Sequence, residues 1–219
     1  MEALLGMPVR VQGASRTDAG AHALYQVGAF TAPRRYPLEV VRNALNAHLP
    51  PDVRVVDAYE VPLSFDPRRH ATLRQYRYLV WNRPEASPFW RRFSFHCPDT
   101  LNTQAMEEVA PLLEGTKDFA SFSGPAGRRR TVRTVACVRI ARKGNLLTFT
   151  LEGNAFLPGQ VRRMVGTLLA VGRGKLGKAE VQALLDNPRA GTAGPALPAC
   201  GLFLTRIHYP NFPPSREVA

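Results

Sequence analysis

The 219-residue chain has few cysteines, little lysine and no long apolar run. Its apolar stretches are interrupted within a few residues by Arg, Gly or Pro, and its first residues, MEALLGMPVRV, have no basic segment ahead of an apolar one. The sequence therefore predicts neither a membrane span nor a secretory signal. The three cysteines, Cys97, Cys137 and Cys200, match neither a C-x-x-C pair nor a zinc spacing. We expect reduced thiols in a soluble, cytoplasmic protein without a disulfide or metal framework.

Acidic residues are too few to balance the arginines, and the imbalance lies in one part of the chain. The formal net charge is +12. Residues 1–66 carry 6 cationic and 7 acidic side chains, whereas residues 67–219 carry 23 and 10. A compositional bias of the gene accounts for arginine in place of lysine, but not for this asymmetry. Arginine forks onto phosphates and stacks on bases, so the second segment is predicted to bind a polyanion such as a nucleic acid.

Hydrophobic periodicity predicts strands alternating with helices, without internal repeats. Hairpins interleaved with helices favour an α+β fold. Prolines and a charge shift around Pro62–Arg69 mark a boundary between an N-terminal domain, 1–66, and a strongly basic C-terminal domain, 67–219. The predicted strands are Val9–Ala14, Tyr25–Phe30, Val53–Val61, Arg74–Trp81, Thr134–Ile140, Leu146–Leu151 and Gly201–His208, and the predicted helices are Pro37–Pro51, Thr103–Glu114, Pro158–Val171 and Glu180–Asp186.

The stretch GASRTDAGAHAL, Gly13–Leu24, gathers several polar side chains into one short loop. An Asp followed by Ala-Gly is common in turns and helix caps, because its carboxylate accepts backbone N–H groups and Gly tolerates positive φ. The alternative is a carboxylate that takes part in chemistry, which is favoured by Arg16 and Asp18 sharing a tight loop in a basic protein. These residues alone leave both interpretations of Asp18 open.

The segment ASRTDAGAHA, Ala14–Ala23, resembles the G-R-T-D-A-G-V-H-A signature of the TruA family of tRNA pseudouridine synthases. The resemblance covers essentially the whole chain. It implies two related α+β domains with mostly antiparallel sheets flanked by helices, an active-site cleft between them, and a homodimer that binds tRNA. The further matching segments, in the family's order, are NALNAHLPPDVRV (43–55), QYRY (75–78), GTKDFASF (115–122), RTVRTV (130–135), NAFLPGQVRRMVGTLLAVGRG (154–174) and GLFL (201–204).

The activity implied by this resemblance is the isomerisation of uridine to pseudouridine at positions 38, 39 and 40 of the tRNA anticodon stem-loop. The N1–C1′ bond must break, the base must rotate, and C5 must bond to C1′ before it loses its proton. An ionised carboxylate can serve as nucleophile or stabilise a cation in such a reaction. The isomerisation is redox-neutral and requires neither cofactor nor metal, and the five histidines have no ligand spacing.

Matching the family's motifs assigns roles to individual residues. Asp18 is the implied catalytic carboxylate, Arg16 helps to flip the target nucleotide, and Arg162 pairs with Asp18 and keeps it ionised and oriented. The ring of Tyr76 packs on the uracil and its hydroxyl is a candidate for removing the C5 proton, while Leu202 packs against the base. Without the resemblance, Arg16 could also be a phosphate clamp or pair with a nearby carbonyl. Tyr76 could be a core tyrosine, and Leu202 is the buried strand leucine that any fold would supply there.

The sequence departs from the family pattern in two places. Gln160 stands where Met is usual, and Pro158 and Gly159 come just before it, at the start of the predicted helix. The family's usual first strand and helix are also missing before the signature, so we expect a start codon assigned too far downstream, with Met1 or Met7 internal to the true protein. The basic run Arg128–Arg130 is either a solvated loop or a contact to the RNA backbone.

Two other functions fit part of this pattern. A truncated, catalytically inactive tRNA-binding paralogue would have no need to retain Asp18, Tyr76 and Arg162 together, so the intact set favours the enzyme. A glycoside hydrolase acting on nucleosides would need two cooperating carboxylates around the scissile bond, and only Asp18 stands in a suitable context.

Overall fold

The computed structural model describes residues 5–124 and 130–210, which form two compact units. The smaller unit contains the described residues of 1–15, 27–71 and 209–219, and the larger contains 16–26 and 72–208. The loop that carries Asp18 is thus grouped with the larger unit. The boundary at residue 66 stays a prediction, since compactness alone does not define independently folding domains. Arg128 and Arg129 of the predicted basic run lie outside the described residues.

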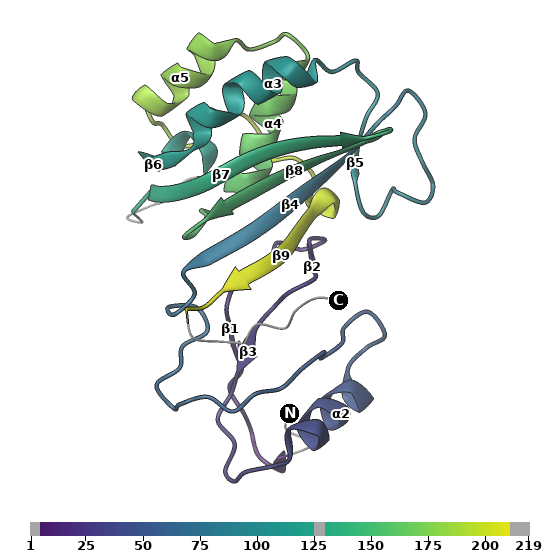
Figure 1. Cartoon of the computed structure of the whole chain (residues 1–219), viewed down its shortest axis with the longest axis vertical. Helices are drawn as coiled ribbons and strands as arrows, with labels where there is room; N and C mark the ends of the chain where they lie inside the picture. Colours follow the sequence, from purple (N-terminus) through teal and green to yellow (C-terminus); the bar gives the residue numbers. More distant parts are fainter. Residues whose placement is uncertain (1–4, 125–129, 211–219) are drawn as a thin grey trace. The chain divides into compact units, whose positions relative to one another are not determined.

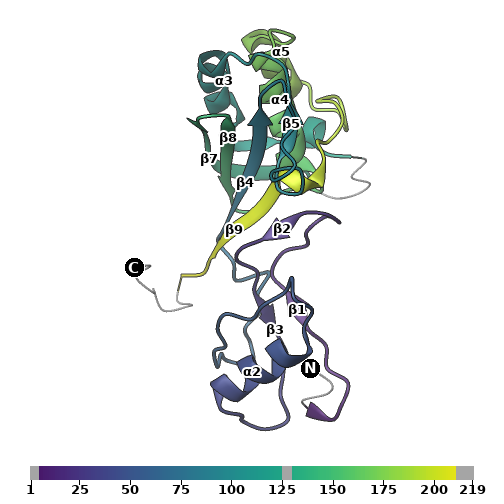
Figure 2. The ribbon, with the colours of Figure 1, turned by 90° about the vertical axis from the view of Figure 1, so that its right-hand side faces the viewer.

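The smaller unit is built around helix α2, Leu38–His48, and a short antiparallel pair, β1 (Gln12–Gly13) with β3 (Gly28–Ala29) (Figure 2). Pro37 directly precedes α2. At the other end of the helix the N–H of the C-cap residue Leu49 donates to the Leu45 carbonyl, directly before Pro50. The predicted helix in this segment is therefore confirmed. The strands are much shorter than the predicted Val9–Ala14 and Tyr25–Phe30.

The predicted strand Val53–Val61 is wrong, because these residues form no strand in the structure. Helix α2 supplies the hydrogen-bond partners that a neighbouring strand would have supplied. The Asn46 side-chain amide donates to the carbonyl of Val55 at 2.9 Å and accepts from its N–H at 2.8 Å. Both backbone groups of Val55 are satisfied in this way, so Val55 needs no partner from a neighbouring strand.

The larger unit contains a seven-stranded sheet in the order β2-β9-β4-β8-β7-β6, with β5 beside the end of β4 (Figure 1). Only β2 with β9 and β4 with β5 are parallel among these pairs of the described chain, so the sheet is mostly antiparallel and the predicted α+β class is confirmed. The strands are β2 His22–Ala23, β4 Leu73–Asn82, β5 Phe95–Cys97, β6 Gly115–Asp118, β7 Val132–Lys143, β8 Leu146–Gly153 and β9 Leu202–His208.

Helices α3 (Thr103–Val109), α4 (Gln160–Gly172) and α5 (Lys178–Asp186) gather on one side of this sheet (Figure 1). Side chains of a strand point alternately to its two faces. On β4 and β8 every second residue is buried, whereas Arg77 on the other face of β4 is exposed. The buried set is Tyr76, Tyr78 and Val80 on β4 and Leu147, Phe149 and Leu151 on β8. This helix-covered face is the core of the unit.

The ends of two helices differ from the predicted ends for local reasons. Helix α3 stops at Val109 and continues as a 3₁₀ turn, because Pro111 has no N–H for an α-helical bond. Helix α4 begins at Gln160 after Gly159, which has φ +71°. The buried Gln160 side chain accepts a hydrogen bond from the N–H of Leu157 at 2.8 Å, so the glutamine itself fixes the start of α4.

No helix among residues 5–124 and 130–210 is long and apolar enough to cross a membrane.

Candidate active site

Asp18 and Arg162 form an ion pair within the larger unit. Arg162 Nη2 donates to Asp18 Oδ2 at 2.5 Å, with 41% of the aspartate side chain and 18% of the arginine side chain exposed. A charge-assisted bond this short holds the carboxylate in one orientation. Because Asp18 remains partly exposed, a solvent-borne substrate can still reach it.

The backbone of Asp18 makes a turn, while its side chain is left for Arg162. The Ala21 N–H donates to the Asp18 carbonyl at 2.9 Å, and Gly20, at the third position of this turn, has φ +83°. The turn expected from Asp-Ala-Gly is therefore present, but it is formed by the backbone carbonyl of Asp18 and not by its carboxylate. A part of the carboxylate in chemistry stays a prediction.

Strand β2 fixes this turn to the edge of the sheet. His22 and Ala23 pair in parallel with Phe203 and Leu204 of β9, and the next N–H, of Leu24, donates to the Leu204 carbonyl at 2.9 Å. A Cβ on Gly20 would lie 3.8 Å from the Cβ of Ala199, so the turn also lies over the segment just before β9. The loop that carries Asp18 is thus held by its pairing with β9 and by its approach to Ala199, and both contacts lie within the larger unit.

A second set of contacts orients Arg162. Its Nη1 donates to the Leu197 carbonyl at 2.6 Å, and the hydroxyl of the fully buried Tyr78 donates to the neighbouring Pro198 carbonyl at 2.7 Å. Burial is the main reason that the pKa of Tyr78 is raised, with a smaller contribution from the nearby Cys200 thiol, so this hydroxyl stays a donor. The segment 197–198 is therefore tied to both α4 and β4.

Tyr76 and Leu202 lie on the same, helix-covered face of the sheet. Tyr76 is opposite Leu204 in the register of β4 and β9, and Leu202 is opposite Tyr78. Each is 7% exposed. The Tyr76 ring meets the Phe156 ring edge-on, with centroids 5.4 Å apart. These two predicted residues come from neighbouring strands and share one apolar surface.

Arg16 is exposed two residues before Asp18. In the described part of the chain its side chain has no hydrogen bond or ion pair, so the structure does not bring it onto the Asp18–Arg162 pair.

Sequence reasoning missed Tyr78 and the Leu197 carbonyl as supports of Arg162. A signal existed for Tyr78, because the alternation in QYRY puts it on the same face as Tyr76. No signal existed for Leu197, since its contribution is a backbone carbonyl whose position depends on the fold.

The described residues contain no group of three or more His, Cys, Asp and Glu side chains placed to hold a metal ion.

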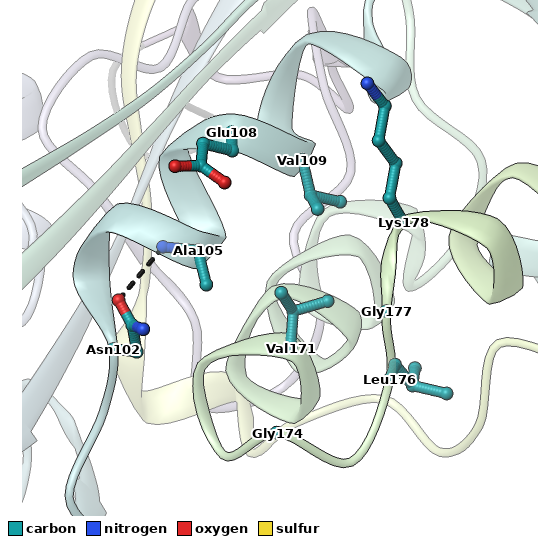
Figure 3. A pocket seen from close by; sticks show the side chains of 9 residues that line it. All are labelled: Asn102, Ala105, Glu108, Val109, Val171, Gly174, Leu176, Gly177 and Lys178. Atoms are coloured by element: carbon teal, nitrogen blue, oxygen red, sulfur yellow. Dashed lines mark hydrogen bonds between the residues drawn. The ribbon is translucent and has the colours of Figure 1, made fainter.

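A pocket of about 290 Å³ lies away from these residues, against α3 and the α4–α5 connection (Figure 3). Two of its polar side chains have internal partners. Asn102 accepts from the Ala105 N–H at 3.0 Å as the cap of α3, and Glu108 accepts from Gln104 at 2.9 Å. None of the predicted site residues lines it, so we assign it no part in the site. The lining residues are Asn102, Ala105, Glu108, Val109, Val171, Gly174, Leu176, Gly177 and Lys178.

Comparison with known proteins identifies the family. A family model described as tRNA pseudouridine synthase matches residues 2–68 and 109–210. The chain belongs to this family. It is 40% identical to tRNA pseudouridine synthase A of Methylacidiphilum infernorum, over 93% of the chain and 80% of that relative. The corresponding protein of Geobacter sulfurreducens is 42% identical over 94% and 85%, and that of Myxococcus xanthus is 39% identical over 99% and 82%.

Membership of the tRNA pseudouridine synthase family confirms the resemblance inferred from ASRTDAGAHA and the other motifs. It also confirms the expected class of enzyme, an isomerase.

Proposed function

We propose that this chain isomerises uridine to pseudouridine at positions 38, 39 and 40 of the tRNA anticodon stem-loop, with Asp18 as the catalytic carboxylate. The observation that carries the proposal is the Asp18–Arg162 pair, formed across 144 residues of sequence in a member of this family. The surplus of cations in residues 67–219 supports a polyanionic substrate.

The reaction needs a group that acts at the sugar or the base while the N1–C1′ bond is broken. A carboxylate oxygen of Asp18 supplies this group, as nucleophile or as the counter-charge of a cation. Arg162 holds that carboxylate in place before the substrate arrives, so little reorganisation is needed during the reaction. Once the base has rotated, C5 bonds to C1′ and then loses its proton, while N1, released from C1′, takes up a proton, so the composition of the nucleoside is unchanged.

Three more residues have proposed roles in holding the base. Tyr76 and Leu202, each 7% exposed on one face of the sheet, are the proposed contacts of the flipped uracil, and the Tyr76 hydroxyl is the candidate for removing the C5 proton. Exposed Arg16 has no hydrogen bond or ion pair within the described chain, and we assign it the role of entering the space of the flipped nucleotide.

The family resemblance further supports a cytoplasmic homodimer that acts without metal or cofactor. Sedimentation of the purified chain at micromolar concentration tests the homodimer directly. A single boundary at the mass of two chains is expected, and a boundary at 24.2 kDa would contradict it.

The activity is tested with an unmodified tRNA transcript that has uridine at positions 38, 39 and 40, in the presence of EDTA. We expect pseudouridine at these three positions, mapped by carbodiimide labelling and primer extension, and none in a transcript with cytidine there. Conversion elsewhere would contradict the proposed positions, and loss of conversion with EDTA would contradict the metal-free reaction. Tight tRNA binding without conversion would instead favour the inactive RNA-binding protein.

A further inference from the structure

The connection between β4 and β5, residues 83–94, projects from one end of the sheet of the larger unit (Figure 1). It lies in residues 69–108, which the family model does not match. The connection presents an unusual combination of side chains for a surface loop. Phe89 is 85% exposed and Phe93 is 43% exposed, and the two residues between Trp90 and Phe93 are the exposed Arg91 and Arg92.

The backbone of this connection is well fixed. The Trp81 and Trp90 rings stack with centroids 6.2 Å apart and planes 17° apart, and Trp81 Nε1 donates to the Glu85 carbonyl at 3.0 Å. The buried Ser94 hydroxyl donates to the Trp90 carbonyl at 2.9 Å, and the Phe93 N–H donates to the same carbonyl at 2.9 Å. The exposure of Phe89 is therefore a property of an ordered loop.

One arginine of the connection has an ion-pair partner, and two others have none among the described residues. Arg83 pairs with Glu85 at 2.9 Å. In the described part of the chain, the guanidinium groups of Arg91 and Arg92 have neither an ion-pair partner nor a hydrogen-bond partner, and the Phe89 ring has no ring contact. Two free cations next to an exposed aromatic ring match the chemistry of single-stranded RNA, which offers phosphates and unstacked bases.

This loop is joined to the loop that carries Asp18. The His22 ring nitrogen Nε2 lies 2.9 Å from the Arg92 carbonyl, and the His22 ring stacks on Phe203 and contacts Phe93, with centroids 4.6 Å and 5.2 Å apart. His22 is four residues after Asp18, so their Cα atoms are at most about 14 Å apart. An RNA whose target uridine lies at Asp18 therefore has neighbouring nucleotides within reach of this loop.

We propose that residues 87–93 form a second RNA-binding element beside the active site, in which Phe89 stacks on an unpaired base and Arg91 and Arg92 bind backbone phosphates. The inference rests on the proposed function for the identity of the RNA, a tRNA. The two cations Arg91 and Arg92, unpaired among the described residues, favour a polyanion such as RNA at this surface over the same loop of a second copy, which carries the same two cations.

Phe89 variants separate stacking from simple apolar contact. Fluorescence anisotropy with an unmodified tRNA transcript measures the affinity. Phe89→Ala and Phe89→Leu are expected to weaken binding at least about fivefold, because an aromatic–base stack is lost, whereas Phe89→Tyr keeps a flat ring and binds like the parent. Leucine that binds as tightly as phenylalanine would overturn the stacking role.

The arginines are tested through salt dependence. Each phosphate contact on a single strand contributes about 0.7 to the slope of log affinity against log salt concentration, so Arg91→Ala/Arg92→Ala is expected to reduce the slope by about 1.4. The matched control is Lys178→Ala/Arg189→Ala, which removes two exposed cations beside α5 and is expected to leave the slope unchanged. Equal slopes in parent and loop variant would overturn the inference.

Turnover distinguishes failure of this inference from failure of the proposed function. At saturating tRNA the loop variants are expected to convert uridine within about twofold of the parent rate, since Asp18 and Arg162 are intact. A parent that forms no pseudouridine would contradict the proposed function, while the affinities would still test the loop. A sedimentation change in Phe89→Ala with unchanged tRNA affinity would overturn the RNA-binding role and point to a contact between copies.

Discussion

Arg162 of α4 binds Asp18 at 2.5 Å and the Leu197 carbonyl at 2.6 Å through the two Nη atoms of one guanidinium. The planar fork therefore links the turn before β2 to the segment before β9. A buried Nε of the same group has no partner in the described chain. The arrangement fixes a carboxylate by a side chain that is itself fixed, as a preorganised site requires.

Replacing Arg162 tests this arrangement. Arg162→Ala is expected to lower the single-turnover rate about ten- to a hundredfold, since a charge-assisted hydrogen bond to the reacting group is lost. Arg162→Lys restores the charge but cannot bind both partners with fork geometry, so only part of the rate should return. Rapid-quench measurement of pseudouridine formation gives the rates. A parental rate in Arg162→Ala would show that the pair has no part in the reaction.

Tyr78→Phe removes one hydroxyl from the buried contact to the Pro198 carbonyl. The free energy of unfolding is expected to fall by about 1 kcal/mol, and the rate should fall as well because the adjacent Leu197 carbonyl orients Arg162. Tyr209→Phe is the control: it loses a similar bond, to Pro67 at 2.6 Å in the smaller unit. Urea unfolding and single-turnover rates are measured for both. Equal rates in the two variants would argue against a positioning role for Tyr78.

Gly153 on β8 is predicted to tolerate no side chain. A Cβ there would lie 2.8 Å from the Thr134 carbonyl oxygen and 3.0 Å from the ring of Phe156, which packs against Tyr76. Gly153→Ala should therefore lower the free energy of unfolding by about 1–3 kcal/mol. At Gly13 the nearest atom would be 4.0 Å away, so Gly13→Ala should change stability much less. Similar denaturation midpoints for the two variants would contradict this packing.

The Asp99–Arg173 pair predicts a pH-dependent contribution to stability. The hydrogen bond from Arg173 Nε, at 2.6 Å, is the main reason that the pKa of Asp99 is lowered. A carboxyl with a lowered pKa in the folded state stabilises the fold above its unfolded pKa, and this contribution is lost as pH falls through the folded value. Asp99→Asn should be less stable than the parent at pH 7, and the difference should disappear as the pH falls below the lowered pKa of Asp99. A pH-independent difference in urea midpoint would rule out this linkage.

Much of the larger unit could be predicted because its signals are local. Alternation in RQYRYLVW indicates β4, the periodicity of Val161, Val165 and Leu168 indicates α4, and the paired apolar runs around Arg142–Asn145 indicate the β7–β8 hairpin. The motifs also identified Asp18 and Arg162, but only as members of a family pattern. Their contact joins residues far apart in the chain and could be established only by the fold.

The smaller unit was predicted less well for a physical reason. The valines of Val53–Val61 have strand propensity, but pairing requires a neighbour, and the side chain of Asn46 satisfies Val55 instead. Tertiary partners of this kind leave no periodic signal. The same holds for the loop of residues 87–93, whose aromatic and basic residues are visible in the sequence, while their exposure and their contact with His22 are not.

The most direct test of the account compares the parent with Asp18→Ala in single-turnover conversion of an unmodified tRNA, with the tRNA affinity of each measured in parallel. We predict no detectable pseudouridine from Asp18→Ala and an affinity within a few-fold of the parent, because one carboxylate contributes little to holding a polyanion. Residual conversion together with a large loss of affinity would contradict the assignment of Asp18 as the catalytic carboxylate.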